Sequence, residues 1–289
     1  MQIRHEHINY KNYQKVWIGK YLNSQNLPHW HKDCELLYVD KGKLRVMCDR
    51  KNYEISEGQT FFIGSEQLHY ISAEDKSSIL TTFFFTDEII KPFADGLTLV
   101  NPVVEGDYGI LKVYEKLKRE FEDQKKFFEL SIKITVSELM LEIFRNEQFC
   151  PKETGVQTTQ TFKKLIASIE NGYEFYTFED AADFMGMNPS YFSRYFHEMA
   201  GMTFTHFLNF IKVKKAIEML QNEKYAVTDV AMMCGFSTIR SFNRVFKQFT
   251  EYTPTAIPGN FILEEALSRT DYTDGNPTLS GCSIIESYS

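Results

Sequence analysis

A segment in the last third of the chain occurs twice. The stretch AADFMGMNPSYFSRYFHEMAGMT, at 181–203, aligns with VAMMCGFSTIRSFNRVFKQFTEYT, at 230–253. Both copies contain Phe-x-Arg-x-Phe, at 192–196 and again 50 positions later at 242–246. Each copy predicts a short helix, a tight turn that contains a glycine, and a second helix. The chain must therefore fold around two helix-turn-helix units.

The turns and the helix starts of these units are marked by particular residue types. Gly186 and Gly235 stand where each turn is expected to need a positive φ angle. Ala182 and Ala231 are small where two helices must cross closely. Helix N-caps are predicted at Thr177 with Asp180 as its capping-box partner, at Asn188 before Pro189, and at Thr203, Thr228 and Ser237.

The second helix of the second unit is predicted to have one apolar and one basic face. The apolar stripe, which we expect to be buried, consists of Ile239, Phe242, Phe246 and Phe249. The opposite face contains Arg240, Asn243, Arg244 and Lys247, and no acidic residue lies between 237 and 250. A single basic hairpin is often only a solvated surface. Duplication favours DNA binding, because the helix predicted between the units, at 204–221, is ~27 Å long and adjacent major-groove segments lie ~34 Å apart.

Two further regions precede the repeat. Between about 17 and 85, strand-length apolar runs alternate with turn residues, which predicts an all-β sandwich or barrel. A helical period begins near Tyr108. The stretch FFELSIKITVSELMLEIF, at 127–144, is apolar on more than one side, so a second subunit is a candidate for covering part of it.

The predicted fold class is therefore α+β. We expect a β-barrel over 1–105, a helical dimerisation or connector segment over 106–150, and a linker over 151–159. An all-α DNA-binding domain should follow over 160–262, with helix-turn-helix units at about 177–200 and 228–250. The polar tail, 263–289, is predicted to be disordered.

Composition argues against several other classes of protein. No uncharged apolar run is long enough to cross a bilayer, and the start, MQIRHEHINYKNY, lacks the apolar centre of a secretory signal. The five cysteines are scattered without a Cys-x-x-Cys pair, which argues against a disulfide framework or a thiolate zinc site. The net charge of −7 does not decide the question of DNA, because local patches do. We expect a cytoplasmic protein with no membrane partner.

The repeat also carries a resemblance. The stretches DVAMMCGFSTIRSFNRVFKQFTEYTP, at 229–254, and FLNFIKVKKAIEML, at 207–220, resemble the signature and the inter-unit helix of the AraC/XylS-type transcription regulators. The resemblance covers about 160–255 and implies that both second helices insert into adjacent major grooves of double-stranded DNA. By position, it implies base-facing roles for Ser190, Ser193, Arg194, Arg240, Asn243 and Arg244, and backbone-phosphate contacts for Tyr191 and Lys247.

The chain departs from this family pattern at two places. Glu251 stands where the family usually has glycine, and Ile257-Pro258 replaces an aromatic residue followed by arginine. Because proline interrupts helices, the helix that should start after Thr253 is expected to be short or missing.

A second resemblance lies in the β-rich region. His29-x-His31-x₃-Glu35-x₆-Gly42, followed by Gly58 and His69, resembles the two motifs of the cupin barrel. In cupins, these three histidines and the glutamate converge on one metal ion. Two departures are that Asn23 replaces the leading glycine of the first motif, and that Gly64-Ser65-Glu66 replaces Pro-x-Gly of the second.

The role of the histidines has three readings. AraC-type regulators commonly carry a cupin-like barrel that binds a small effector, often a sugar, which implies an effector site of His29, Trp30, His31, Glu35 and His69. The four residues without Trp30 can instead bind a metal, because imidazole and carboxylate suit Zn, Fe, Mn or Ni. They can also lack a ligand role. The favoured reading is the effector site, with no cofactor.

The sequence thus predicts a ligand-responsive, DNA-binding transcription regulator that is not an enzyme. The resemblance favours an activator with a carbohydrate effector, which acts as a homodimer and has RNA polymerase as a candidate partner. The alternative is a cupin-type metalloprotein or enzyme that uses His29, His31, Glu35 and His69, with the helical part as an accessory domain.

Overall fold

The computed structural model describes residues 4–5, 15–26, 28–151, 157–222, 225–261, 263 and 283–289. The chain divides into two compact units. One contains residues 5–154 and 281–289 and is rich in strands, and the other contains 1–4 and 155–280 and is helical. The α+β prediction, with a β-rich domain followed by helices and then a helical domain, is confirmed.

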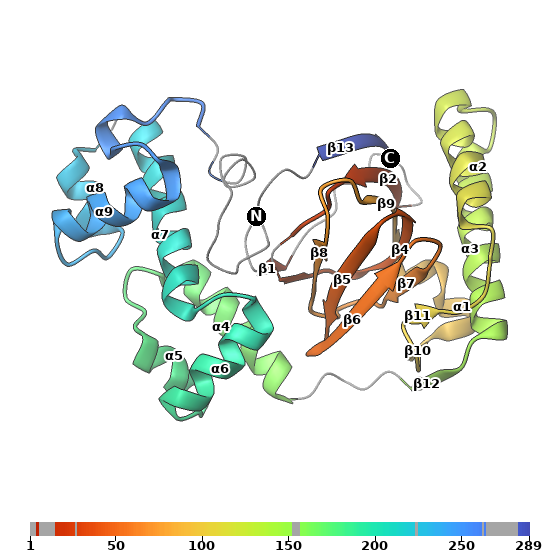
Figure 1. Cartoon of the computed structure of the whole chain (residues 1–289), viewed down its shortest axis with the longest axis horizontal. Coiled ribbons are helices and arrows are strands. Elements are labelled where there is room, and N and C mark those ends of the chain that lie inside the picture. The colour runs from red at the N-terminus through yellow and green to blue at the C-terminus, as the bar shows by residue number, and fades with distance from the viewer. Residues whose placement is uncertain are drawn as a thin grey trace. The chain divides into compact units, whose positions relative to one another are not determined.

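The β-rich unit contains two larger sheets (Figure 1). The five-stranded sheet has the order β1-β3-β8-β5-β6, with β1 Arg4–His5, β3 His29–Trp30, β8 His69–Ala73, β5 Lys43–Cys48 and β6 Lys51–Ser56. The six-stranded sheet has the order β11-β7-β4-β9-β2-β13, with β11 Val103–Val104, β7 Thr60–Ile63, β4 Asp33–Lys41, β9 Ile79–Thr86, β2 Val16–Leu22 and β13 Ser283–Tyr288.

Strand β4 shows how the sheets divide the core into two layers. Its residues Leu37 and Val39 belong to a cluster that side chains of both sheets fill. Cys34 and Leu36, which alternate with them, belong to a second cluster between the six-stranded sheet and the helices. Because successive side chains of a strand point to opposite faces, Glu35 shares the barrel-interior face with Leu37.

Helices cover the outer face of the six-stranded sheet (Figure 1). The main pair is α2, Ile110–Asp123, and α3, Phe128–Asn146. Smaller elements precede and follow them: η1 Asp87–Ile89, α1 Lys91–Ala94, and the two-stranded sheet of β10 Leu97–Leu99 and β12 Phe149–Pro151. No helix among the described residues has the length and apolarity that a bilayer crossing requires.

The helical unit contains two helix pairs with α7 between them (Figure 1). Its elements are α4 Gln157–Gly172, α5 Phe178–Phe184, α6 Pro189–Ala200, α7 Phe204–Gln221, α8 Val227–Met233, α9 Ile239–Thr250 and η2 Pro254–Ala256. The pairs α5–α6 and α8–α9 are the two predicted helix-turn-helix units. Their turn glycines have the expected positive φ angles, 63° at Gly186 and 70° at Gly235.

The predicted N-caps at Thr177, Asn188 and Thr203 are confirmed, including the capping box of Thr177 with Asp180. Two others are wrong. Helix α8 begins after Ala226 rather than Thr228, and α9 begins after Thr238, whose hydroxyl accepts a hydrogen bond from the Ser241 amide, rather than Ser237.

Four further expectations are refined or corrected. Ile239 is 42% exposed, because it is the first residue of α9 and lies at the end of the buried stripe. The disorder predicted for 263–289 is wrong for its last residues, since 283–288 form β13, which pairs with β2; residues 264–282 lie outside the described part. Helix α4 begins inside the predicted linker 151–159, of which 152–156 are likewise not described.

The helix expected after Thr253 is short among the described residues. It consists there of η2, and one further described residue, Leu263, is helical.

Candidate functional site

The first candidate surface lies on the second helix of each helix-turn-helix unit. The eight residues that the sequence predicted to face DNA are all exposed: Ser190, Tyr191, Ser193 and Arg194 on α6, and Arg240, Asn243, Arg244 and Lys247 on α9. Most apolar positions on the same two helices are buried, including Phe192, Phe196, Phe242 and Phe246. Each helix therefore presents its polar side to solvent and packs its aromatic side into the domain.

The helix starts are fixed by side-chain caps. The Asn188 side-chain oxygen accepts a hydrogen bond from the Tyr191 amide at 2.9 Å. The Thr238 hydroxyl accepts one from the Ser241 amide at 3.1 Å. Such caps satisfy amides that have no partner within the helix. The first turns of α6 and α9, which contain Ser190, Tyr191 and Arg240, are therefore held in place.

The turn of the second unit has support that the sequence analysis missed. Lys212 of α7 is only 8% exposed, and its ammonium group donates a hydrogen bond to the Gly235 carbonyl at 2.9 Å. The same ammonium group lies 5.6 Å from the centroid of the Phe236 ring. Burial lowers the pKa of Lys212. A side chain at Gly235 would also overlap the backbone of Glu174, so the α4–α5 loop packs against this turn. The sequence signal that could have revealed this contact is Lys212 itself, a lysine at a buried position of α7.

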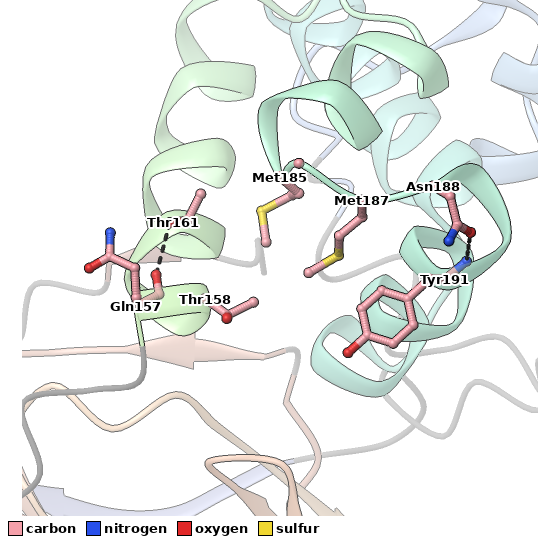
Figure 2. A pocket seen from close by; sticks show the side chains of 8 residues that line it. Gln157, Thr158, Thr161, Met185, Met187, Asn188 and Tyr191 are labelled. Atoms are coloured by element: carbon pink, nitrogen blue, oxygen red, sulfur yellow. Dashed lines mark hydrogen bonds between the residues drawn. The ribbon is translucent and has the colours of Figure 1, made fainter.

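A groove of about 410 Å³ lies beside the start of α6. Figure 2 shows Thr158 and Thr161 of α4 on one side of it, with Met185, Met187 and Tyr191 opposite. Tyr191 therefore forms part of the groove wall as well as the exposed face of α6. Asn188 also lines the groove, where its side chain caps α6.

The second candidate site is a buried cluster in the barrel. One ligand atom from each of His29, His31, Glu35 and His69 lies within 4.8 Å of the others, and all four residues are buried. The antiparallel pairing of β3 with β8 places His29 directly opposite His69. Glu35 comes from β4, in the other sheet. The structure therefore brings together four of the five predicted pocket residues from three strands and one loop.

The backbone fixes how two of the imidazoles face the cluster. Nδ1 of His31 lies 2.8 Å from the Asp33 carbonyl oxygen, and Nδ1 of His69 lies 2.9 Å from that of Gln67. A carbonyl oxygen only accepts hydrogen bonds, so Nδ1–H must be the donor in both rings. In the neutral rings, Nε2 then carries a lone pair. These atoms lie 3.6 and 3.1 Å from the Glu35 Oε2 atom, respectively.

Glu35 supplies the carboxyl group of the cluster, and the other three residues supply imidazoles. Burial raises the pKa of Glu35, whereas its contacts with His31 and His69 lower it more, to about 2, which requires a proton or another positive charge on the Nε2 side of those rings. Glu35 Oε2 and His69 Nε2 make no hydrogen bond although they lie in contact. An ionised carboxylate and imidazole lone pairs that converge in a buried space are suited to a cation.

These residues fit a first-row transition metal. Donors bound to one zinc ion at ~2.0–2.1 Å are at most about 4.2 Å apart, close to the spacing of this cluster. The carbonyls of Asp33 and Gln67 fix the imidazole tautomers, as the outer partners of metal-bound histidines generally do. The fifth predicted residue, Trp30, is 5% exposed and is not part of the four-residue group.

Family models match both units. A model described as an AraC-like ligand binding domain matches residues 22–140, and one described as a helix-turn-helix domain matches 181–258. The first therefore includes all four residues of the buried cluster, and the second includes both α6 and α9.

Similar proteins include an uncharacterized HTH-type transcriptional regulator, YdeC, of Bacillus subtilis. It is 22% identical over 257 residues, which cover 83% of this chain and 88% of YdeC. The HTH-type transcriptional activator RhaR of Escherichia coli is 24% identical, over 78% of this chain and 85% of RhaR. Relatives in Staphylococcus aureus are longer, and the chain spans 31% of their length.

Among solved structures, ToxT of Vibrio cholerae, crystallised with an unsaturated fatty acid, has a TM-score of 0.37 and 12% sequence identity. The match covers 85% of this chain and 95% of ToxT.

Proposed function

The chain belongs to the AraC/XylS-type DNA-binding transcription regulators with an N-terminal cupin-like sensor domain, and from that family we propose how it reads DNA and what it senses. The observation that carries the proposal is the pair of solvent-exposed polar faces on α6 and α9. Both belong to one compact helical unit and are joined by the 18-residue helix α7. An array of this size can present two helices to adjacent major grooves on one face of a duplex.

The proposed contacts divide into two kinds. Ser190, Ser193 and Arg194 of α6, with Arg240, Asn243 and Arg244 of α9, contact base edges. Tyr191 and Lys247 contact backbone phosphates, which position the protein without specifying sequence. Arginine can donate two hydrogen bonds to guanine, and asparagine can pair with adenine in the same two-bond manner. We therefore assign the main sequence-reading roles in the second unit to Arg240, Asn243 and Arg244.

A binding titration against DNA from upstream of the chain's own gene tests this function. Arg244→Ala should weaken specific binding by roughly 5- to 150-fold, which corresponds to about 1–3 kcal/mol for one base contact. Gln248→Ala is the matched control, because Gln248 is also exposed on α9 but carries no charge. Unchanged affinity in Arg244→Ala, or no specific binding by the wild type at low salt, would overturn the proposal.

For the barrel, we propose that a small effector acts on the regulator through the interior site. A carbohydrate is the effector class that the family resemblance favours. A ligand can shift the regulator only by binding one of its arrangements more tightly than another. Thermal unfolding with a panel of sugars tests the class, because a ligand at 100 times its dissociation constant stabilises a protein by about 2.7 kcal/mol.

A second candidate for this domain is a metal-binding one, and the buried cluster specifically favours it. His29, His31, Glu35 and His69 would hold the ion, which would supply a positive charge to offset the buried Glu35 carboxylate. In the regulator, such an ion either is the signal or completes the effector site. The relatives are regulators rather than enzymes, so we assign no catalytic role to the cluster.

Metal analysis of protein purified without a metal-affinity column separates the two candidates. A metal site predicts close to one equivalent of a transition metal in the wild type and its loss in Glu35→Gln and His69→Ala. His197→Ala is the matched control, since His197 is exposed on α6, in the other unit. Metal-free wild-type protein that is also not stabilised by added Zn²⁺, Mn²⁺, Fe²⁺ or Ni²⁺ would reject the metal candidate and leave the DNA proposal intact.

Helix α3 supports the proposal that the regulator works as a homodimer. Phe127, just before the helix, and Leu130, Ile134 and Leu141 are 69%, 52%, 46% and 39% exposed, respectively. Their spacing of three, four and seven positions is the spacing of a coiled-coil seam. A second copy of the chain can cover this stripe.

We further propose that the protein acts in the cytoplasm as an activator that contacts RNA polymerase. The activator RhaR, among the similar proteins, supports that direction of control. A reporter gene placed behind the chain's operator tests it: an activator raises expression above the level in cells that lack the protein.

A further inference from the structure

The last residues of the chain form a strand of the sensor domain rather than of the DNA-binding domain. Strand β13, Ser283–Tyr288, pairs antiparallel with β2, with Ile284 opposite Tyr21 and Tyr288 opposite Ile18. It is the outermost strand of the six-stranded sheet. The match to the helix-turn-helix model ends at 258, so this strand lies beyond the part of the chain that the model covers. Both ends of the DNA-binding unit are therefore connected to the sensor domain.

Side chains fasten β13 to α2 as well as to β2. The carboxylate of Glu286 accepts hydrogen bonds from the Tyr114 hydroxyl at 3.1 Å and from the Lys118 ammonium group at 2.7 Å. The Tyr288 hydroxyl donates to Glu122 at 3.1 Å. The rings of Tyr288 and Phe121 are stacked, with centroids 6.5 Å apart and an angle of 19° between their planes.

These contacts depend on which residues of β13 face α2. Glu286 and Tyr288 lie two positions apart and share the face of β13 that meets α2. A bulge lies between Ile284 and Glu286, and both isoleucines, Ile284 and Ile285, are more than half exposed. Glu286 and Tyr288 are thus the residues of this strand that contact α2, and its isoleucines are exposed. That pattern distinguishes a docking segment from a strand held by apolar burial alone.

Loss of β13 would leave polar groups of β2 and α2 without partners. Without β13, the seven-residue strand β2 would form the edge of the sheet and leave backbone groups unpaired. Tyr114 is fully buried, and its hydroxyl would lose the Glu286 acceptor. The surface is therefore complementary to a short strand with an acidic residue followed two positions later by an aromatic one, which the chain's own end supplies.

We propose that the edge of β2 together with α2 is a docking site for the chain's own residues 283–288, and that the docked strand is a second attachment of the DNA-binding domain to the sensor domain. The first attachment is the chain between Pro151 and Gln157. From Leu263 to Ser283 the chain has 20 steps, which reach at most ~70 Å. That reach allows the strand to dock on its own sensor domain. The first attachment, with six steps, reaches at most ~22 Å and sets how far the DNA-binding domain moves from the barrel. The docked strand adds a second point of connection, which restricts how the domain turns about the first.

Cysteine cross-linking in the full chain tests the docking and its register. In a background with Cys150→Ser and Cys282→Ser, the pair Tyr21→Cys with Ile284→Cys should form a disulfide within one chain, because these residues are opposite each other. The pair Tyr21→Cys with Ser287→Cys is the control, since Ser287 is opposite Gly19 instead. No cross-link in the matched pair, or cross-links only between two chains, would overturn docking within one molecule.

The attachment is tested by hydrogen exchange and by interdomain distance. Glu286→Lys should accelerate amide exchange in β2 at least tenfold, and the exchange should slow again when Lys118→Glu is added. In the same variant, fluorescence energy transfer between dyes at Glu54→Cys and Asp183→Cys should give a broader distance distribution than in the wild-type background. If the two distributions coincide while β2 exchange is accelerated, β13 serves only to cover the sheet, and the second-attachment proposal fails.

Discussion

At the scale of single residues, three of the non-glycine residues with positive φ angles stand where the family resemblances expect glycine. Asn23, Glu66 and Glu251 have φ angles of 52°, 66° and 64°. Asparagine adopts this conformation with little penalty, whereas for most other residues it costs about 1–2 kcal/mol. The backbone at these three positions therefore has the conformation that glycine favours, and it is strained at Glu66 and Glu251.

We predict that Glu251→Gly stabilises the DNA-binding domain by about 1 kcal/mol, because it removes this strain at the cost of a more flexible unfolded chain. The change is measured as a rise in the melting temperature. Gly201→Ala is the matched comparison, since Gly201 ends α6 as Glu251 ends α9, with a φ angle of 66°. It should lower the melting temperature. A lower melting temperature for Glu251→Gly would show that the Glu251 side chain makes a stabilising contact.

The residue scale also shows what the sequence could and could not reveal about the site. His29, His31 and Glu35 were recognisable because their spacing matches a known motif. His69 was recognisable too, but only through the resemblance to the second cupin motif, because the antiparallel pairing of β3 with β8 that places it opposite His29 is not encoded by local spacing. Lys212 escaped notice because a lysine on a helix is usually solvated. Its role depends on the Gly235 carbonyl, which comes near only after α7 packs against α8.

At the scale of secondary-structure elements, helices were easier to predict than their interactions. The helix-turn-helix pairs were visible because apolar periodicity, caps and glycines are all local signals. Strand β13 was not, because SIIESY becomes a strand only by pairing with β2, more than 250 positions earlier in the chain. Its charged residue is also typical of a solvated tail until Lys118 and Tyr114 are placed beside it.

Helix α3 should mediate self-association. We predict that Leu130→Asp or Ile134→Asp converts a dimer into a monomer, because a charge placed in the apolar seam must lose its hydration when two copies pack together. Sedimentation at micromolar concentration measures the change. Lys133→Asp, on an exposed position of the same helix, is the control and should leave the mass unchanged. A wild-type chain that sediments as a monomer at all concentrations contradicts this role for α3.

The docking of β13 should depend on pH in the acid range. The hydrogen bond from Lys118 lowers the pKa of Glu286 below its ordinary value of 4.5, and Tyr114 adds to that effect. A group with a depressed pKa stabilises the folded form above its ordinary pKa, and this contribution is lost as the pH falls through the depressed value. The amide chemical shifts of β2 should therefore stay constant from pH 7 to pH 5 and change below about pH 4.5. In Glu286→Gln, a persisting acid step would assign the change to another carboxylate.

At the scale of the whole molecule, the two candidate sites lie in different compact units. The buried cluster is built from β3, the loop after it, β4 and β8, and the residues proposed to read DNA lie on α6 and α9. The reading helices belong to two copies of one structural unit, so binding energy should be divided between them.

We predict that Arg194→Ala and Arg244→Ala weaken DNA binding additively, within about 0.5 kcal/mol, because distant sites without shared partners contribute independently. Competition titrations of the two single variants and the double variant at one salt concentration measure this. Circular dichroism of each variant confirms that the exposed substitutions leave the fold intact. If the double variant binds no more weakly than Arg244→Ala alone, the first unit does not contact the operator.

The position of β13 matters for anyone who handles the protein. A purification tag or fluorescent protein joined after Ser289 leaves from the flank of the barrel, next to β2 and α2, and not from the domain that reads DNA. Such fusions would pull on the sheet that carries Glu35. A label intended to follow DNA binding is better carried on an exposed residue of the helical domain.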